Sequence, residues 1–181
     1  MSNCGINVTV ACRASSSEEW FDPTLPLRIF PYYPSNEAMK FRKKYVRGFI
    51  TPGACNFYIG VANGNKIFGI LGFKKPDYGN YDLLLKADTT NGNEGSIDLL
   101  LFALRTKETK ETLDVKFSRD IKSVISKCFS LHESIGRYRK HGKLIRKEII
   151  DGSGFDLTYE FQTGEIPSLK AAKALWLQKR K

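Results

Sequence analysis

A loop rich in glycine and asparagine, TNGNEGS at positions 90–96, is the first stretch whose residue types could do chemistry. An apolar run at 81–87 precedes it and an apolar-periodic run at 97–105 follows it, which predicts a strand, a loop and a helix. Free N–H groups in the first turn of a helix attract phosphate. A turn that needs positive φ before a capped helix gives the same pattern, so both interpretations stand. The residues expected to hold a phosphate or pyrophosphate are Gly92, Asn93, Glu94, Gly95 and Ser96.

The sequence has two histidines, at positions 132 and 141, and only His132 is a candidate site residue. Neither lies in an HxH or HExxH pattern, so a metal hydrolase is not indicated. His132, beside Glu133, could activate an amine or bind a metal together with Cys128. The alternative is a polar pair at the start of a helix. We expect no metal site.

The four cysteines, Cys4, Cys12, Cys55 and Cys128, are scattered and form no CxxC pair. This spacing predicts neither a zinc site nor a disulfide framework. Cys128 at a strand end could be a nucleophile, but a small buried thiol is the more common role. The sequence also lacks a GxSxG elbow and a Walker loop.

The net charge of +10, from 29 Lys and Arg against 19 Asp and Glu, is high for 181 residues. A field of this sign concentrates polyanions, which favours nucleic acid and phosphorylated ligands as partners. A solvated, soluble surface is the alternative. The basic residues bunch at 40–47, 137–147 and 170–181. The expected nucleic-acid contacts are Lys40, Lys43, Lys44, Arg47, Arg137, Arg139 and Lys140.

The composition indicates one ordered domain, with 41% hydrophobic and 12% aromatic residues. No apolar run approaches the roughly 20 residues that span a bilayer, and the N-terminus does not read as a signal peptide. We therefore expect a soluble protein of the host or bacterial cytoplasm. The expected division is a domain over 1–166 and a basic C-terminal helix, 167–181, packed on it.

The expected elements of the first half are strands, helices and one hairpin. They are a strand at 6–10, a short helix ending at Asp22-Pro23, an irregular loop at 23–34, and a basic helix that Ser35 caps and Gly48 ends. Strands at 56–62 and 66–73 form a hairpin through Asn63-Gly64. A third strand at 81–87 and a helix from Ile97 to about Lys107 follow.

In the second half of the chain, one segment is compatible with more than one secondary structure. The charged segment 106–120 could extend the helix or form a loop and a short strand. A strand at 124–129, a short helix at 131–138, two strands at 144–150 and 155–161 and a final helix come next. The predicted fold class is mixed α/β (α+β), with a mostly antiparallel central sheet and flanking helices.

This order of elements resembles the GNAT acyltransferase superfamily over roughly residues 5–162. The glycine-rich loop after the third meander strand and Tyr138 in 134–144, before a closing strand, carry the resemblance. It implies that the loop holds the pyrophosphate of acetyl-CoA or a related acyl-CoA. It also implies that the strand end at Leu85, Lys86 and Ala87 orients the thioester. Tyr138 would be the general acid, with His132 as a second candidate, and aromatic packing is the alternative for Tyr138.

Within that superfamily the chain resembles the Mom-like branch of bacteriophage proteins. The short motifs are Asn93 to Ser96, Cys128 to Ser130, His132 and Tyr138 on a basic body. The resemblance implies modification of adenine in DNA, which protects phage DNA from restriction. Two alternatives remain open, namely a non-catalytic nucleic-acid-binding protein on the same scaffold and an N-acetyltransferase acting on a protein or small amine.

Overall fold

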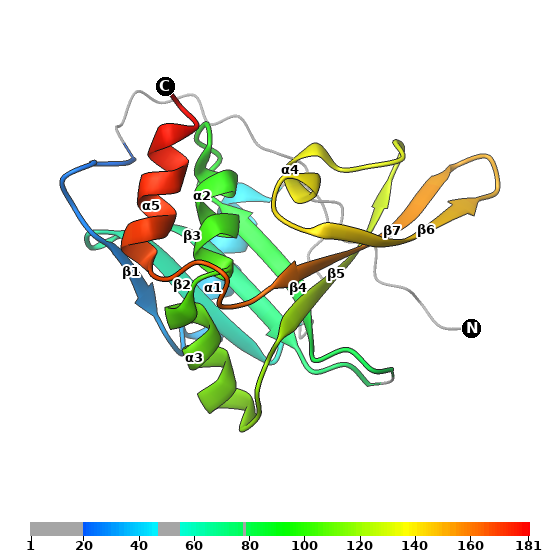
Figure 1. Ribbon diagram of the computed structural model, residues 1–181, viewed down its shortest axis with the longest axis horizontal. Coiled ribbons are helices and arrows are strands. Elements are labelled where there is room, and N and C mark those ends of the chain that lie inside the picture. Colours follow the sequence, from blue (N-terminus) through cyan, green and yellow to red (C-terminus); the bar gives the residue numbers. More distant parts are fainter. Residues whose placement is uncertain (1–19, 47–54, 78) are drawn as a thin grey trace.

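The computed structural model describes residues 20–46, 55–77 and 79–181, and its centre is a seven-stranded sheet (Figure 1). The strand order is β1-β2-β3-β4-β5-β7-β6, and the β4–β5 pair is parallel while the others are antiparallel. This confirms the predicted mixed, mostly antiparallel sheet. The strands are β1 Leu27–Phe30, β2 Phe57–Asn63, β3 Lys66–Lys74, β4 Leu83–Thr90, β5 Ser123–Ser130, β6 Lys143–Ile150 and β7 Gly154–Gln162.

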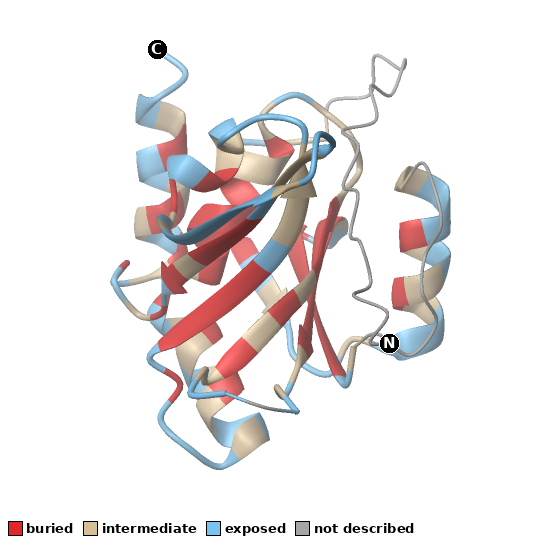
Figure 2. Ribbon diagram, turned by 90° about the vertical axis from the view of Figure 1, so that its right-hand side faces the viewer, coloured by how far each residue is buried: buried red, intermediate tan, exposed pale blue. Residues whose placement is uncertain are grey.

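Helices cover both faces of the sheet (Figure 2). On one face α2 contacts β3, β4 and α5, and the large apolar core lies between these elements. On the other face α1 contacts β2 and β4 over a smaller core of Ala38, Tyr58, Ile70 and Ala87. No helix within the described ranges is long and apolar enough to cross a membrane. The helices are α1 Ser35–Tyr45, α2 Ser96–Leu104, α3 Lys107–Phe117, α4 Gly136–Arg139 and α5 Leu169–Gln178.

The strands β4 and β5 are paired only where they begin. Their register joins Leu83 to Val124 and Leu84 to Ile125, and no later pair is formed. A bulge in β4 contributes to this divergence. Between β3 and β4, Gly72 pairs with Ala87 and the next residue, Phe73, pairs with Leu85, so the pairing skips Lys86. A bulge bends its strand and changes where the next side chains point. The C-terminal halves of β4 and β5 therefore open a wedge in the sheet.

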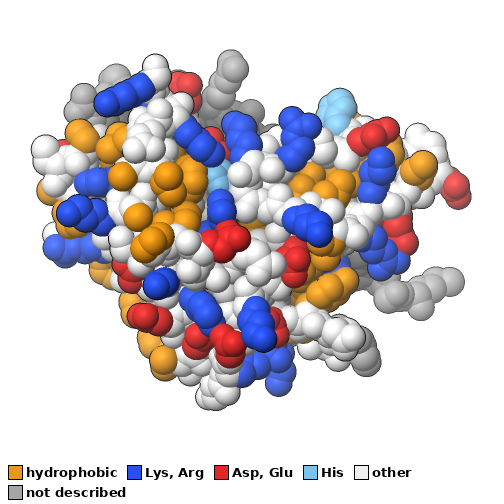
Figure 3. Space-filling model, viewed as in Figure 1, with side chains coloured by type: hydrophobic (Ala, Val, Ile, Leu, Met, Phe, Trp, Pro, Cys, Tyr) orange, Lys and Arg blue, Asp and Glu red, His pale blue; other side chains and the backbone are white. Residues whose placement is uncertain are grey.

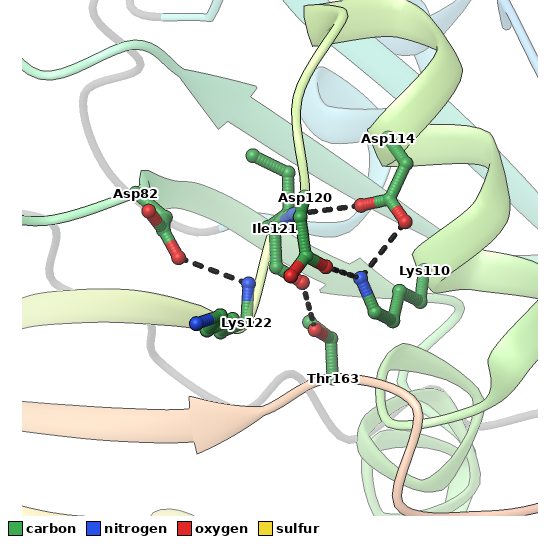
Figure 4. A network of polar contacts seen from close by, with 7 residues as sticks. All are labelled: Asp82, Lys110, Asp114, Asp120, Ile121, Lys122 and Thr163. Atoms are coloured by element: carbon green, nitrogen blue, oxygen red, sulfur yellow. Dashed lines mark hydrogen bonds and ion pairs between the residues drawn. The ribbon is translucent and has the colours of Figure 1, made fainter.

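A polar network around the start of β5 holds the closed end of this wedge (Figure 4). The Asp82 carboxylate accepts the Lys122 N–H at 2.9 Å, and the Asp114 carboxylate accepts the Ile121 N–H at 2.7 Å. The Ile121 carbonyl accepts the Thr163 hydroxyl. These bonds tie α3, the segment before β4 and the segment after β7 to the same end of β5. Lys110 completes the network by pairing with Asp114 and Asp120.

Several predicted elements have different bounds in the structure. The segment 106–120 forms α3, because the Thr106 side chain caps a new helix; α2 therefore ends at Leu104 rather than near Lys107. The short helix predicted at 131–138 is confined to α4. Ser35 is the first residue of α1 and makes no capping bond. The third meander strand runs to Thr90, so the loop is shorter than predicted.

The proline-rich segment 23–34 contains a strand that the sequence interpretation missed. Its residues 27–30, which lie between Pro26 and Pro31 and include no proline, form β1, and this strand pairs with β2 at the edge of the sheet. Trp20, expected in a helix, is not helical and packs its ring against Phe68 and Trp176. The strand predicted at 6–10, the rest of the helix predicted before Asp22, and Gly48 lie outside the described residues.

Candidate active site

A cluster of ionisable side chains lies where β4 and β5 diverge. Asp88 comes from β4, Cys128 from β5, and Arg137 and Tyr138 come from α4. The Tyr138 hydroxyl donates a hydrogen bond of 2.5 Å to the Asp88 carboxylate. The Arg137 guanidinium lies over the Tyr138 ring at 5.0 Å from its centroid. Three elements far apart in sequence thus bring an acid, a phenol, a guanidinium and a thiol together.

The bulge in β4 determines which face of the sheet Asp88 occupies. Leu85 belongs to the core beneath α2, whereas Ala87 belongs to the core beneath α1. In an unbroken strand these two residues would point to the same face. The extra residue, Lys86, reverses the alternation, and Asp88 consequently reaches Tyr138 on the α4 side. A bulge next to a functional group is a common way to re-aim a side chain.

Tyr138 is held by its ring as well as by its hydroxyl. The ring packs edge-on against Tyr159 and Phe161, with centroids 5.4 Å away in both cases. Burial raises the pKa of Tyr138, and the neighbouring Asp88 raises it further. The phenol therefore keeps its proton at neutral pH, as a proton donor must. The packing and chemical interpretations of Tyr138 are both compatible with this position.

Asp88 is a site residue that the sequence interpretation missed. Its carboxylate is buried, and burial raises the pKa, while Arg137 and the Tyr138 hydrogen bond act in the opposite direction. A carboxyl whose pKa is raised holds a proton more readily than an exposed one, which suits a group that takes up and returns protons. A signal was present, because Asp88 is an acidic residue within the apolar strand next to the loop, but the strand was predicted to end at position 87.

The local structure around α4 depends on two backbone features. The Ile135 N–H donates to the Tyr159 hydroxyl at 2.8 Å, which fixes the entry to the helix. The Gly142 N–H bonds to the Tyr138 carbonyl at 2.8 Å and ends the turn. A side chain at Gly142 would collide with the Glu160 carbonyl and the ring of Phe161. The short helix is therefore tied closely to β7.

The glycine-rich loop has the geometry of an open helix start. Gly92 and Gly95 have φ of 77° and 74°, so positive φ is needed here. Gly95 is the N-cap of α2, and no side chain caps the helix. The Ser96 hydroxyl instead donates to the Asn93 carbonyl at 2.7 Å. Within the described chain, the N–H groups of 94, 95, 97 and 98 have no acceptor, so this loop could bind an anion.

The C-terminal helix supports this loop from outside. Trp176 donates from its indole N–H to the Gly95 carbonyl at 2.9 Å, and Arg180 donates to the Glu94 carbonyl at 2.9 Å. The Arg180 guanidinium also stacks on the Trp176 ring at 4.6 Å. These bonds use carbonyl groups and leave the N–H groups free. The Glu94 side chain is exposed, so it does not fill the loop.

His141 is a buried histidine in the structure and was not among the predicted site residues. Its Nε2 lies 2.9 Å from the Asp98 carboxylate in the first turn of α2. Its Nδ1 is buried without a partner in the described chain, and its ring meets Phe102 edge-on. Burial lowers the pKa of His141. The contact links the turn after α4 to the first turn of α2 and so fixes the glycine-rich loop relative to Tyr138.

The other predicted catalytic residue, His132, has an exposed side chain before α4. Its backbone N–H bonds to the Ser130 hydroxyl at 3.0 Å, and its ring has no polar partner in the described ranges. The structure does not join it to the Asp88 cluster. Burial and Asp88 raise the pKa of Cys128 to about 12, so its thiol is a poor nucleophile. Among described residues, no group of three or more acidic, His or Cys side chains is arranged to bind a metal.

The predicted nucleic-acid contacts do not form one surface. Lys40, Lys43 and Lys44 are exposed on α1, and Lys40 pairs with Glu37 at 2.8 Å. Basic residues of α4 lie on the opposite face of the sheet, where Arg139 and Lys140 are exposed. Figure 3 shows that Lys and Arg side chains on this face are dispersed among acidic ones. Arg137 is half-buried and stacks on Tyr138, whereas Arg47 lies outside the described residues.

Comparison with known families identifies the chain. A family model described as the phage GNAT-like domain matches residues 32–181. The chain therefore belongs to the phage GNAT-like family. A comparison with curated proteins found no match.

Two solved structures resemble the fold. One is described as a candidate acetyltransferase of the GNAT family from Desulfovibrio desulfuricans, with TM-score 0.47, 11% identity, and coverage of 75% of this chain and 98% of that one. The other is N-acetylglutamate synthase from Neisseria gonorrhoeae, complexed with coenzyme A and L-arginine, with TM-score 0.45, 6% identity and coverage of 77% of this chain. This chain spans 34% of that synthase. At these low identities and TM-scores, neither likeness carries information about activity or ligands.

Proposed function

We propose that this protein transfers an acyl group from a coenzyme A thioester to an amine. The observation that carries the proposal is the 2.5 Å hydrogen bond between Tyr138 and Asp88 at the opening between β4 and β5. Membership of the phage GNAT-like family supports the same activity. The open start of α2 supports it further, because free backbone N–H groups suit the pyrophosphate of coenzyme A.

Each part of the site has a role in this proposal. The backbone of Gly92 to Ser96 binds the pyrophosphate. The bulged part of β4 at Leu85, Lys86 and Ala87 borders the wedge and orients the thioester. When bound, the thioester supplies an activated acyl carbon. Tyr138, whose proton is retained by burial, lies within the wedge as the acid for the departing sulfur.

The Asp88–Tyr138 pair also accounts for the protons of the reaction. The acceptor amine loses one proton as its nitrogen bonds to the acyl carbon, and the Asp88 carboxylate accepts that proton. The Tyr138 hydroxyl gives its proton to the sulfur as the carbon–sulfur bond breaks. Asp88 then returns a proton to Tyr138 across their hydrogen bond. The products are an amide and a free thiol, and both side chains are restored.

For the acceptor, we propose a base amine of DNA, with adenine as the first candidate, as in Mom-like proteins. The net charge of +10 favours a polyanionic partner, and the family is a phage family. A base inside a duplex is inaccessible, so it would leave the stack to reach a site buried in the wedge. Such modification would protect phage DNA from restriction enzymes.

Mass analysis of nucleosides tests this function. Duplex DNA is incubated with the protein and acetyl-CoA, digested to nucleosides and analysed beside DNA treated with the Asp88→Asn, Tyr138→Phe double variant. We expect a new adenine adduct only with the wild-type protein. Unmodified DNA that nevertheless binds tightly and with strong salt dependence would favour a non-catalytic binding protein. Acylation of an added amine or peptide instead of DNA would identify an N-acetyltransferase.

A further inference from the structure

Arg42 is the arginine of α1, and its side chain points toward the sheet rather than toward solvent. Its side chain lies between α1 and the sheet and is 5% exposed, whereas its neighbours Lys43 and Lys44 are exposed. A guanidinium is always ionised in proteins, so burying it removes a full positive charge from water. Such a group is normally paired with a carboxylate or another anion.

Within the described part of the chain, no hydrogen bond or ion pair joins Arg42 to a carboxylate, and Asp88 interacts with it only through space, from a side chain directed to the other face of β4. Its one hydrogen bond there is a long one, 3.5 Å from Nη1 to the Tyr58 hydroxyl. Its Nε is buried and has no acceptor. None of the ion pairs among described residues includes Arg42. The guanidinium therefore presents unsatisfied donors in a region shielded from water.

The groups around Arg42 do not neutralise it either. Tyr58 is 3% exposed, and burial raises its pKa to about 12, so it remains an uncharged hydroxyl. That hydroxyl has a second long contact, 3.8 Å to the Met39 sulfur. Burial likewise raises the pKa of Cys55, which keeps this thiol neutral. The guanidinium therefore meets an uncharged hydroxyl and an uncharged thiol, and its Nε still has a donor to offer to an anion.

We propose that Arg42 and Tyr58 form a binding subsite for a phosphate group of the acceptor nucleotide. A guanidinium with a free Nε and a neighbouring hydroxyl donor can make two or more charge-assisted hydrogen bonds to phosphate oxygens. The exposed Lys43 and Lys44 on the same helix add a positive field outside the subsite. A phosphate would satisfy donors that the protein itself leaves unpaired.

The subsite lies beside the reaction centre but on the other face of β4. Ala87 packs against Tyr58 in the core beneath α1, and its neighbour Asp88 bonds to Tyr138 on the α4 side. Arg42 is close enough to act on the charge of Asp88. A nucleotide phosphate at Arg42 would thus place the rest of the acceptor near the wedge. This assignment rests on the proposed function, because it assumes a phosphorylated acceptor.

The test compares wild type with Arg42→Gln in a phosphate-free buffer at constant ionic strength. Thermal unfolding is measured without ligand, with inorganic phosphate and with deoxyadenosine monophosphate, and affinities are measured by titration calorimetry. Arg105→Gln is the matched control, because Arg105 is paired with Glu165 at 2.6 Å. Deoxyadenosine, which lacks the phosphate, and acetate, which is a carboxylate, complete the ligand set.

We expect Arg42→Gln to be at least as stable as wild type without ligand, because it removes an unpaired buried charge. We also expect phosphate to stabilise wild type and the Arg105 variant more than Arg42→Gln, in which only the glycine-rich loop remains to bind it. Wild type should bind the monophosphate at least tenfold more tightly than it binds deoxyadenosine. Arg42→Gln should bind the two ligands with similar affinity. A large loss of stability in ligand-free Arg42→Gln would overturn the proposal, because it would show a structural role. An unchanged phosphate response, no response in wild type, or equal binding of acetate would also overturn it.

These binding measurements are independent of acyl transfer. Phosphate binding that requires Arg42, in a protein that never modifies DNA, would retain the subsite and remove the DNA-modifying function. DNA modification at the wild-type rate by Arg42→Gln would retain that function and remove the subsite.

Discussion

Replacing Tyr138 by Phe separates proton transfer from packing. The ring keeps its contacts with Tyr159 and Phe161, and the hydrogen bond to Asp88 is lost. A general acid contributes typically about 10²- to 10⁴-fold, so we expect a rate loss in that range. Leaving buried Asp88 without this donor costs about 1–3 kcal/mol. For a chain of this size, that corresponds to a melting temperature lower by about 2–12 °C.

The assay measures thiol release from acetyl-CoA together with formation of the nucleoside adduct, well below the melting temperature of each variant. Tyr159→Phe is the matched control. The Tyr159 hydroxyl accepts the Ile135 N–H at 2.8 Å, so this variant also loses one partly buried hydrogen bond, at a ring that packs against Tyr138. It should lose stability but keep most of the rate. A wild-type rate in Tyr138→Phe, or equal rate losses in both variants, would show that Tyr138 only packs.

Three further predictions concern the loop, the surface and the pH dependence. Gly95→Ala should lose about 1–2 kcal/mol because φ is 74° there, and it should weaken coenzyme A binding in calorimetry, since the new Cβ also displaces Arg180. Replacing Lys43 and Lys44 by Ala should lower the slope of log affinity for DNA against log salt concentration by about one unit for each phosphate that the variant no longer neutralises. An unchanged slope would mean that these two lysines contact only solvent. Asp88, whose pKa is raised above 3.8 by folding, binds its proton more tightly in the folded state, so it should reduce stability as pH rises from about 4 through the raised pKa. Asp88→Asn should remove this slope in denaturant titrations across pH, and an identical slope in the variant would contradict the assigned environment.

Much of the sheet could be predicted because its strands carry local signals. The β-rich runs of β2 and β3 flank a turn at Gly64 with φ of 61°, so the hairpin needed no tertiary information. The strand β1 was missed since Pro26 and Pro31 flank it directly, and four residues between two prolines resemble part of an irregular loop. In α3, more than half of the residues are charged and only Thr109 and Leu113 are buried, so the pattern could not distinguish a helix from a loop.

The candidate site was predicted in part, and the missing residues have a common cause. Tyr138 was a candidate because the segment 134–144 before a closing strand resembles the GNAT superfamily, which implies a general acid at this tyrosine. Asp88 could not be assigned a face, because the bulge at Lys86 changes the alternation and a bulge has no reliable sequence pattern. Arg42 was counted with the basic surface of its helix, since charge pattern alone assigns arginine to solvent. His141 was missed because its partner, Asp98, is 43 residues away.

The strand β4 is the element that connects these findings. Without its bulge, Asp88 would point toward α1, close to the unpaired guanidinium of Arg42, and the two charges would neutralise each other beneath that helix. The bulge instead directs Asp88 to Tyr138, which leaves a carboxyl with a raised pKa on one face and an unpaired cation on the other. Each arrangement costs folding free energy, and buried groups of this kind cluster where a protein binds and reacts. Two such groups on opposite faces of one strand, beside the wedge between β4 and β5, favour a site that binds an anionic acceptor and moves its proton.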